Sequence, residues 1–178
     1  MNIKKILILT IIVLAVFSCL SVANAGVFDF LGGDAQQNAT YKFDGFTLDL
    51  AKDAEFANTT TKLPTGEAKI YAAKYEPNGK DSKVIVIEAL SGEGFSKSID
   101  EFKNTWIADG AKDMGSYNNW TILDFQSMSK STIDSYGIDL NTTSYGMAIH
   151  SGSKVIVIEG NDLEEMKKVA DTFKEIKD

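Results

Sequence analysis

The stretch Ser82-Lys83-Val84-Ile85-Val86-Ile87-Glu88 decides the fold, and it recurs identically as Ser153-Lys154-Val155-Ile156-Val157-Ile158-Glu159. Consecutive valine and isoleucine residues are typical of a central strand that is covered on both faces of a sheet. The turn Asn78-Gly79 precedes the first copy and the turn Ser151-Gly152 precedes the second, which predicts a β-hairpin around each copy. A chance match is the alternative explanation, because buried strands draw on few residue types.

An amphipathic helix is predicted after each copy. Ser98 and Glu101 match a capping box at the start of the first helix, and Gly110 ends it. Asp162 and Glu165 match the same arrangement at the start of the second. The apolar stripes at helical spacing are Ile99, Phe102 and Trp106 in the first helix, and Leu163, Met166, Ala170, Phe173 and Ile176 in the second.

Alternation of apolar and polar residues predicts further strands. The pattern occurs at Phe46, Leu48 and Leu50 and at Tyr145, Met147 and Ile149. The stretches from Ala68 to Glu76 and from Trp120 to Phe125 are also expected to be strands. The predicted fold is therefore α+β, a largely antiparallel sheet of about six strands with helices packed on it. The offset of 71 positions between the copies is longer than a solenoid unit, so we expect pseudo-duplicated hairpin-helix halves within one domain.

The first 25 residues have the features of a secretory signal peptide. Lys4 and Lys5 precede an apolar stretch, and Ala23-Asn24-Ala25 supplies the small residues that a signal peptidase requires. The expected organisation is a signal peptide at 1–25, a flexible linker at 26–40 and a single α+β domain at 41–178. The mature protein is expected to begin at Gly26 and to be secreted or placed at the cell surface.

Two alternatives keep the chain at a membrane. The leader is retained as an anchor in the first, although its apolar run is shorter than the 20 or so residues that span a bilayer. In the second, Cys19 carries a lipid, because Val16-Phe17-Ser18-Cys19 loosely resembles a lipobox. Membrane contact is expected only in these two cases.

Composition excludes several classes of site from the mature chain. The only cysteine of the sequence, Cys19, lies in the leader, so disulfides and thiolate metal sites are excluded from the mature chain. The formal net charge changes from −7 to −9 when Lys4 and Lys5 are removed with the leader, and the chain contains no arginine. An acidic chain is repelled by phosphate backbones, so no nucleic-acid partner is expected.

The C-terminal stretch carries a resemblance to a known family. Residues 155–162, Val-Ile-Val-Ile-Glu-Gly-Asn-Asp, run into residues 167–174, Lys-Lys-Val-Ala-Asp-Thr-Phe-Lys. This sequence resembles the final strand and helix of PsbP-like α/β/α sandwich domains, and it is similar to small exported archaeal proteins of unknown function. The resemblance implies a non-enzymatic binding or assembly module, and it carries over no site residue.

Candidate modification sites are the clearest chemical signal in the mature chain. The Asn-x-Thr acceptor motif for N-glycosylation begins at Asn38, Asn58, Asn119 and Asn141. In an exported protein these motifs predict surface positions that carry glycan in a host that glycosylates. Asn119 is the weakest candidate because the apolar Trp120 follows it at a predicted strand start.

No catalytic, cofactor or metal site is assigned from the sequence. His150 is the only histidine, and its hypothetical role is that of a general base beside Ser151 or Ser153; an ordinary turn histidine is the favoured interpretation. Gly92-Glu93-Gly94 lacks the third glycine of a dinucleotide loop. Residues 109–113 lack most ligands of a calcium loop.

These observations predict a non-catalytic exported or cell-envelope domain with a binding or structural role. Its expected partner is a protein, glycan or lipid that contacts a sheet face, and no cofactor is expected. The alternative is an exported hydrolase that uses carboxylates or His150.

Overall fold

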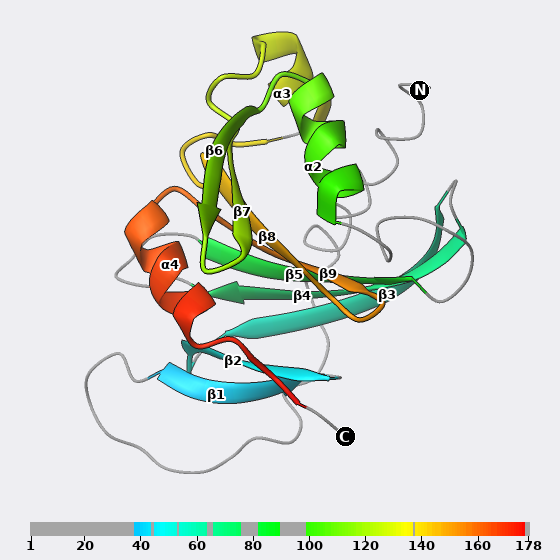
Figure 1. Cartoon of the computed structure of the whole chain (residues 1–178), viewed down its shortest axis with the longest axis vertical. Helices are drawn as coiled ribbons and strands as arrows, with labels where there is room; N and C mark the ends of the chain where they lie inside the picture. The colour runs from blue at the N-terminus through cyan, green and yellow to red at the C-terminus, as the bar shows by residue number, and fades with distance from the viewer. Residues whose placement is uncertain are drawn as a thin grey trace.

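The computed structural model describes residues 38–43, 45–52, 54–63, 66–75, 82–89, 99–136 and 138–176. Within these ranges the chain forms a large antiparallel sheet, a small antiparallel sheet and three helices (Figure 1). The large sheet has the order β3 (Glu55–Leu63), β4 (Gly66–Tyr75), β5 (Ser82–Ala89), β9 (Lys154–Gly160), β8 (Tyr145–Ser151), β7 (Trp120–Asp124) and β6 (Lys112–Tyr117). The small sheet has the order β1 (Asn38–Phe43), β2 (Phe46–Ala51) and β10 (Lys174–Glu175).

The helices cover opposite faces of the large sheet. Helix α2 (Ile99–Ala108) contacts β7 and β8, whereas α4 (Leu163–Asp171) contacts β9 and β2; α3 (Lys130–Tyr136) connects β7 to β8. Along β9, Val155 and Val157 pack with the α2 cluster, and Ile156 and Ile158 pack with the α4 cluster. Because successive strand residues point to opposite faces, β9 supplies both cores. We call these faces the α2 face and the small-sheet face.

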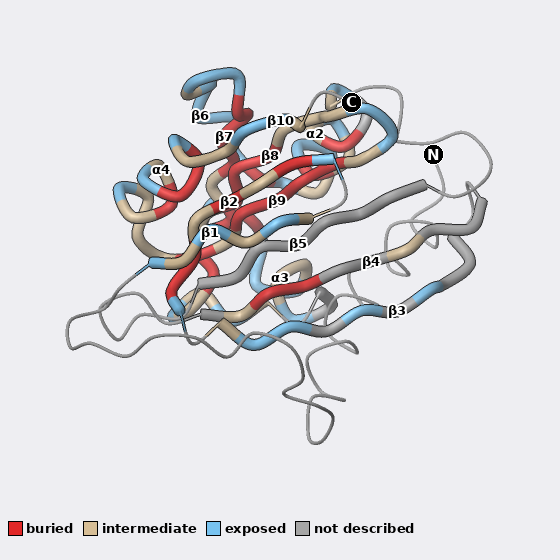
Figure 2. Tube along the Cα trace, turned by 90° about the horizontal axis from the view of Figure 1, so that it is seen from below, coloured by how far each residue is buried: buried red, intermediate tan, exposed pale blue. Residues whose placement is uncertain are grey.

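The burial of β9 explains its sequence. Its four central residues, Val155 to Ile158, are at most 3% exposed, and Figure 2 shows the same strand within the buried centre of the molecule. The prediction of a strand covered on both faces is confirmed for this copy. Both copies occupy central positions in the strand order.

The two identical copies pair with each other as the neighbouring strands β5 and β9. Their register places Lys83 opposite Glu159 and Glu88 opposite Lys154. Because lysine is the second residue and glutamate the last residue of each copy, antiparallel pairing places opposite charges across from each other near both ends. Opposite charges in directly paired positions favour this register over neighbouring ones.

The structure corrects the finer fold predictions while the α+β class stands. One sheet of about six strands is wrong, because a separate small sheet packs on a longer one. The pseudo-duplicated halves are also wrong. Val84 lies opposite Ile158, three positions from its counterpart Val155, so equivalent backbone positions of the two copies lie on opposite faces of the sheet. The second half also contains α3 between β7 and β8, whereas the described residues of β3, β4 and β5 have no helix between them.

The predicted helix boundaries are confirmed in part. Helix α2 begins at Ile99 and is followed by Gly110, whose φ of +99° suits glycine. Asp162 caps α4 by accepting hydrogen bonds from the backbone N–H groups of Glu164 and Glu165. The second helix is shorter than predicted, because it ends at Asp171 and the chain then extends into β10. Phe173 and Ile176 therefore lie beyond the helix.

Thr172 explains the early end of α4. Its hydroxyl donates to the carbonyl of Val169 and accepts the backbone N–H of Asp49 on β2. The N–H of Ile176 then donates to the carbonyl of Gly45. These bonds anchor the C-terminal segment to the small sheet, and Phe173 packs on Phe46 with ring centroids 5.6 Å apart.

The alternating strands are found where the pattern predicts them. Phe46, Leu48 and Leu50 of β2 are at most 1% exposed, and Met147 of β8 is fully buried. Strand β1 begins at Asn38, inside the predicted linker 26–40. The signal peptide, Cys19, the rest of that linker, the Asn78-Gly79 turn, the Gly92-Glu93-Gly94 stretch and Ser98 lie outside the described residues.

Candidate functional site

His150 and Ser151 lie at the end of β8 and not in the predicted turn. Successive residues of a strand point to opposite faces, so the imidazole and the Ser151 hydroxyl face away from each other. The Ser151 hydroxyl instead donates to the Glu175 carboxylate of β10, at 2.7 Å. Ser153 is exposed in the two-residue turn, where Gly152 has a φ of +59°. The arrangement does not form a general-base pair between His150 and Ser151.

Several acidic side chains of the described residues form hydrogen bonds or ion pairs within the fold. Asp113 of β6 forms a 2.6 Å ion pair with Lys103 of α2 and accepts the backbone N–H of Gly115. The Lys103 hydrogen bond, followed by that of Gly115, lowers the pKa of Asp113. Within the described ranges, no three acidic, histidine or cysteine side chains are grouped to hold a metal ion.

A second polar contact ties the β6–β7 hairpin to α4. The Tyr117 hydroxyl and the Asn118 amide donate to the two carboxylate oxygens of Asp171, each at 2.8 Å. The hydrogen bond to Asp171 raises the pKa of Tyr117. Lys167 lies 5.4 Å from the centroid of the Tyr117 ring. The hairpin is thus held by α4 on one face and, through Asp113, by α2 on the other.

The four predicted glycosylation asparagines are all exposed. Asn38 is on β1, Asn58 is on β3, Asn119 is in the β6–β7 turn with a φ of +69°, and Asn141 is in the loop between α3 and β8. The threonines of the motifs differ: Thr40 and Thr60 are exposed, whereas Thr121 is 8% and Thr143 is 3% exposed. In the folded chain, both polar groups of the motif are exposed only at Asn38 and Asn58.

An aromatic cluster lies where strands β1 and β3 approach each other. The Phe56 ring of β3 lies 4.9 Å from the ring of Tyr41 and 6.3 Å from that of Phe43, both on β1. Phe43 in turn stacks on Phe46 of the buried core, at 4.8 Å. Phe56 is 45% exposed, so this cluster continues from the core to the surface. Contiguous apolar clusters that reach the surface are found at binding surfaces, whereas single exposed apolar residues are common.

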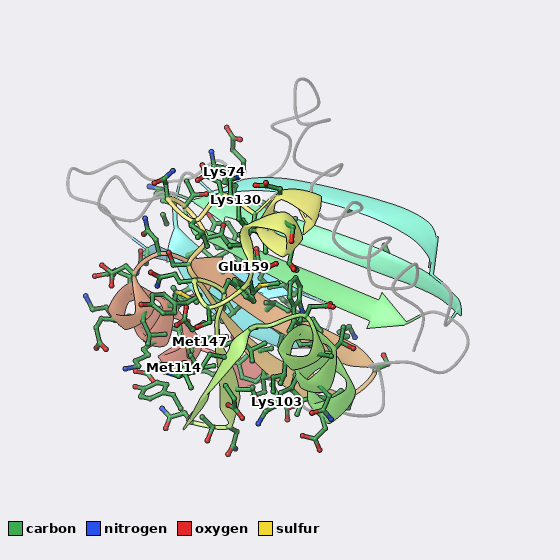
Figure 3. All side chains as sticks on the ribbon, turned by 90° about the horizontal axis from the view of Figure 1, so that it is seen from above. Lys74, Lys103, Met114, Lys130, Met147 and Glu159 are labelled. Carbon is green, nitrogen blue, oxygen red and sulfur yellow. The ribbon has the colours of Figure 1, made fainter. Side chains whose placement is uncertain are left out.

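The edges of the large sheet differ in their protection. At one edge, β6 contains a register shift between Asp113 and Ser116, and Gly115 has a φ of +86°. Such a bulge disrupts further pairing, and Figure 3 shows Met114 of β6 and Lys103 of α2 on the same side of the molecule. At the other edge, all nine residues of β3 pair with β4 without a shift. The sequence does not predict β3, because its Asn-Thr-Thr-Thr segment does not alternate in hydropathy.

In comparisons with known proteins, no family model, no curated sequence and no solved structure matches this chain. Among the described helices, none is both long and apolar enough to cross a lipid bilayer.

Proposed function

We propose that this chain is an exported domain of the cell surface or envelope that binds a partner or acts structurally, without a catalytic role. The leader at 1–25 supports export. The observation that carries the binding role is the aromatic cluster at the β1 and β3 edges, where Phe56 remains 45% exposed beside Tyr41 and Phe43. Exposed aromatic rings supply large contact areas with little loss of side-chain entropy.

The competing function is an exported hydrolase that uses His150 or carboxylates. The opposed directions of His150 and Ser151, and the bond from Ser151 to Glu175, favour the binding role over this alternative. A hydrolase needs its nucleophile and base within hydrogen-bond reach of each other, or of one shared water.

Export is tested by the intact mass of native protein. We expect the measured chain to start at Gly26, without lipid on Cys19. A mass that includes Met1 contradicts export with cleavage. A mass that includes a diacylated Cys19 contradicts a freely soluble product and places the domain at a membrane.

The non-catalytic role is tested with the purified mature chain in a broad screen of ester, amide and glycoside substrates. We expect no turnover by the wild-type chain. Turnover that disappears in His150→Ala, while a change at the exposed Asn104 of α2 retains it, contradicts the proposal and supports the hydrolase.

A further inference from the structure

We propose that two copies of this chain associate through their β3 strands, forming one continuous antiparallel sheet across a twofold axis. This inference extends the proposed binding role to one partner, a second copy of the chain. The axis passes midway between Thr59, the middle residue of β3 (Glu55–Leu63), and Thr59 of the second copy.

Strand β3 has the features of a pairing edge. It is the outermost strand of the large sheet, and in Figure 2 the small sheet lies over the middle of that sheet, while the Tyr41 and Phe43 rings of β1 reach Phe56 near the start of β3. Within the described ranges β3 pairs only with β4, so its other side presents a row of backbone groups. Unlike β6, it has no bulge. The six residues from Phe56 to Thr61 contain no charge and no proline.

The other edges are less suited to pairing. Strand β10 has only two residues, and β6 is interrupted by its bulge. Strand β1 has six residues and carries the exposed Lys42, a residue type that blunts edges. Length and regularity therefore select β3.

Symmetry restricts the register of this pairing. A twofold axis perpendicular to a sheet keeps each residue on its own face, and directly paired residues share a face. The residue numbers of two directly paired residues, one from each copy, therefore differ by an even number. The register in which all nine residues pair satisfies this condition, with Thr59 opposite Thr59 of the second copy.

The sequence of β3 is self-complementary in that register. Asn58 lies opposite Thr60, Phe56 opposite Lys62, and Glu55 opposite Leu63 of the second copy. No two like charges are paired. The exposed Asn58 and Thr60 form a polar pair that can hydrogen-bond across the strands. A parallel arrangement in register places Glu55 beside Glu55 and Lys62 beside Lys62, which disfavours it.

The burial of β3 supports the same surface. Phe56 and Asn58 lie two positions apart, on the small-sheet face, because Phe56 pairs with the buried Ala73. Phe56, Asn58 and Thr60 are all exposed in the single chain. The second copy covers part of this exposed row.

The test is the oligomeric state of the mature chain, measured by sedimentation velocity over a range of concentrations. We expect a reversible dimer for the wild type. In the double variant Asn58→Lys with Thr60→Lys, two pairs of lysines face each other across the axis, and we expect the dimer dissociation constant to rise about a hundredfold or more. The control Asn104→Lys with Ala108→Lys adds equal charge to exposed positions of α2 and is expected to leave the dimer intact.

A charge-swap experiment separates loss of pairing from loss of folding. The variant Asn58→Asp with Thr60→Asp is expected to be monomeric alone and to form a heterodimer with the double lysine variant. A monomeric wild type at all concentrations overturns the proposal, and so does a dimer that survives the double lysine change. A partner peptide that pairs with β3 in a monomeric chain also overturns it. None of these outcomes bears on the export and hydrolase tests, so the two proposals fail separately.

Discussion

The two faces of the large sheet are covered by segments of very different sequence separation. On the α2 face, the core comes mainly from residues 99–148, a continuous segment, together with Val155 and Val157. On the small-sheet face, β2 near one end of the described chain packs against α4 near the other, and Asp49 is hydrogen-bonded to Thr172. The α2 face is thus built mainly from residues close together in sequence, and the small-sheet face from residues far apart. Contacts between residues far apart in sequence form late in folding, because closing a long loop costs entropy.

The largest expected effect on stability comes from removing the Trp120 ring, the largest fully buried side chain of the small-sheet face. Trp120 is 1% exposed and meets Phe173 edge to face, with centroids 5.6 Å apart. Trp120→Ala is expected to cost about 3–5 kcal/mol of unfolding free energy, because it leaves a large cavity. Chemical denaturation measures this cost.

Hydrogen exchange then distinguishes the two faces. Trp120→Ala is expected to reduce protection in β1, β2 and β10 before α2 is affected. Trp106→Ala, which removes the 7% exposed ring of the α2 face, is expected to do the reverse. Equal loss of protection everywhere in both variants contradicts the separation of the two cores.

Overpacking the α2 face gives the next largest effect. A Cβ added at Gly146 of β8 lies 2.8 Å from Cζ of Phe125, which is 2% exposed. Gly146→Ala is therefore expected to destabilise the chain by about 1–3 kcal/mol. Phe125→Leu in the same chain shortens the ring side chain, so the double variant is expected to be more stable than the sum of the two single changes. Additive free energies of unfolding contradict this packing explanation.

Much of this comparison is visible in the sequence. The alternation in Phe46, Leu48 and Leu50 identifies β2, and the repeated Val-Ile-Val-Ile run identifies β9, because burial and strand period leave direct marks on hydropathy. The caps at Asp162 and Gly110 are local and are equally readable. The pairing of the two copies was missed, because register depends on contacts between distant segments.

The candidate site was less predictable than the fold. The exposed edge at Phe56 and Asn58 depends on which strand is outermost, and strand order is not encoded in any local pattern. The early end of α4 depends on the contact between Thr172 and Asp49, two residues far apart in sequence. The motif at Asn58 did mark part of the surface, but its position on an edge strand emerged only from the topology.

The paired charges of β5 and β9 lie on both faces of the large sheet. Glu159 of β9 pairs with Lys83 on the α2 face, and Lys154 pairs with Glu88 on the small-sheet face. Glu159→Lys is expected to cost about 0.2–1 kcal/mol, because like charges then lie opposite each other. Lys83→Glu in the same chain is expected to restore the loss. Urea denaturation of the two variants measures the coupling, and absence of rescue contradicts the proposed role of these charges in setting the register.

The smallest effects come from the two contacts that hold the β6–β7 hairpin, and they respond to opposite ends of the pH scale. The pKa of Asp113 is lowered by Lys103, so this stabilisation is present above the ordinary aspartate pKa and is lost as the pH falls through the lowered value. The pKa of Tyr117 is raised by Asp171, so its stabilisation is present below the ordinary tyrosine pKa and is lost as the pH rises through the raised value.

Two variants separate these contacts. Asp171→Asn is expected to return the Tyr117 pKa toward its ordinary value, seen as tyrosinate absorbance at lower pH, with Asp113 unchanged. Lys103→Met is expected to raise the Asp113 pKa, seen in the carboxyl resonance by NMR, with Tyr117 unchanged. Asp113 is exposed and Tyr117 is only partly buried, so the accompanying changes in stability are small. A shift of both pKa values by either variant means that the hairpin moves as one body, and the two faces then share a single restraint at this edge.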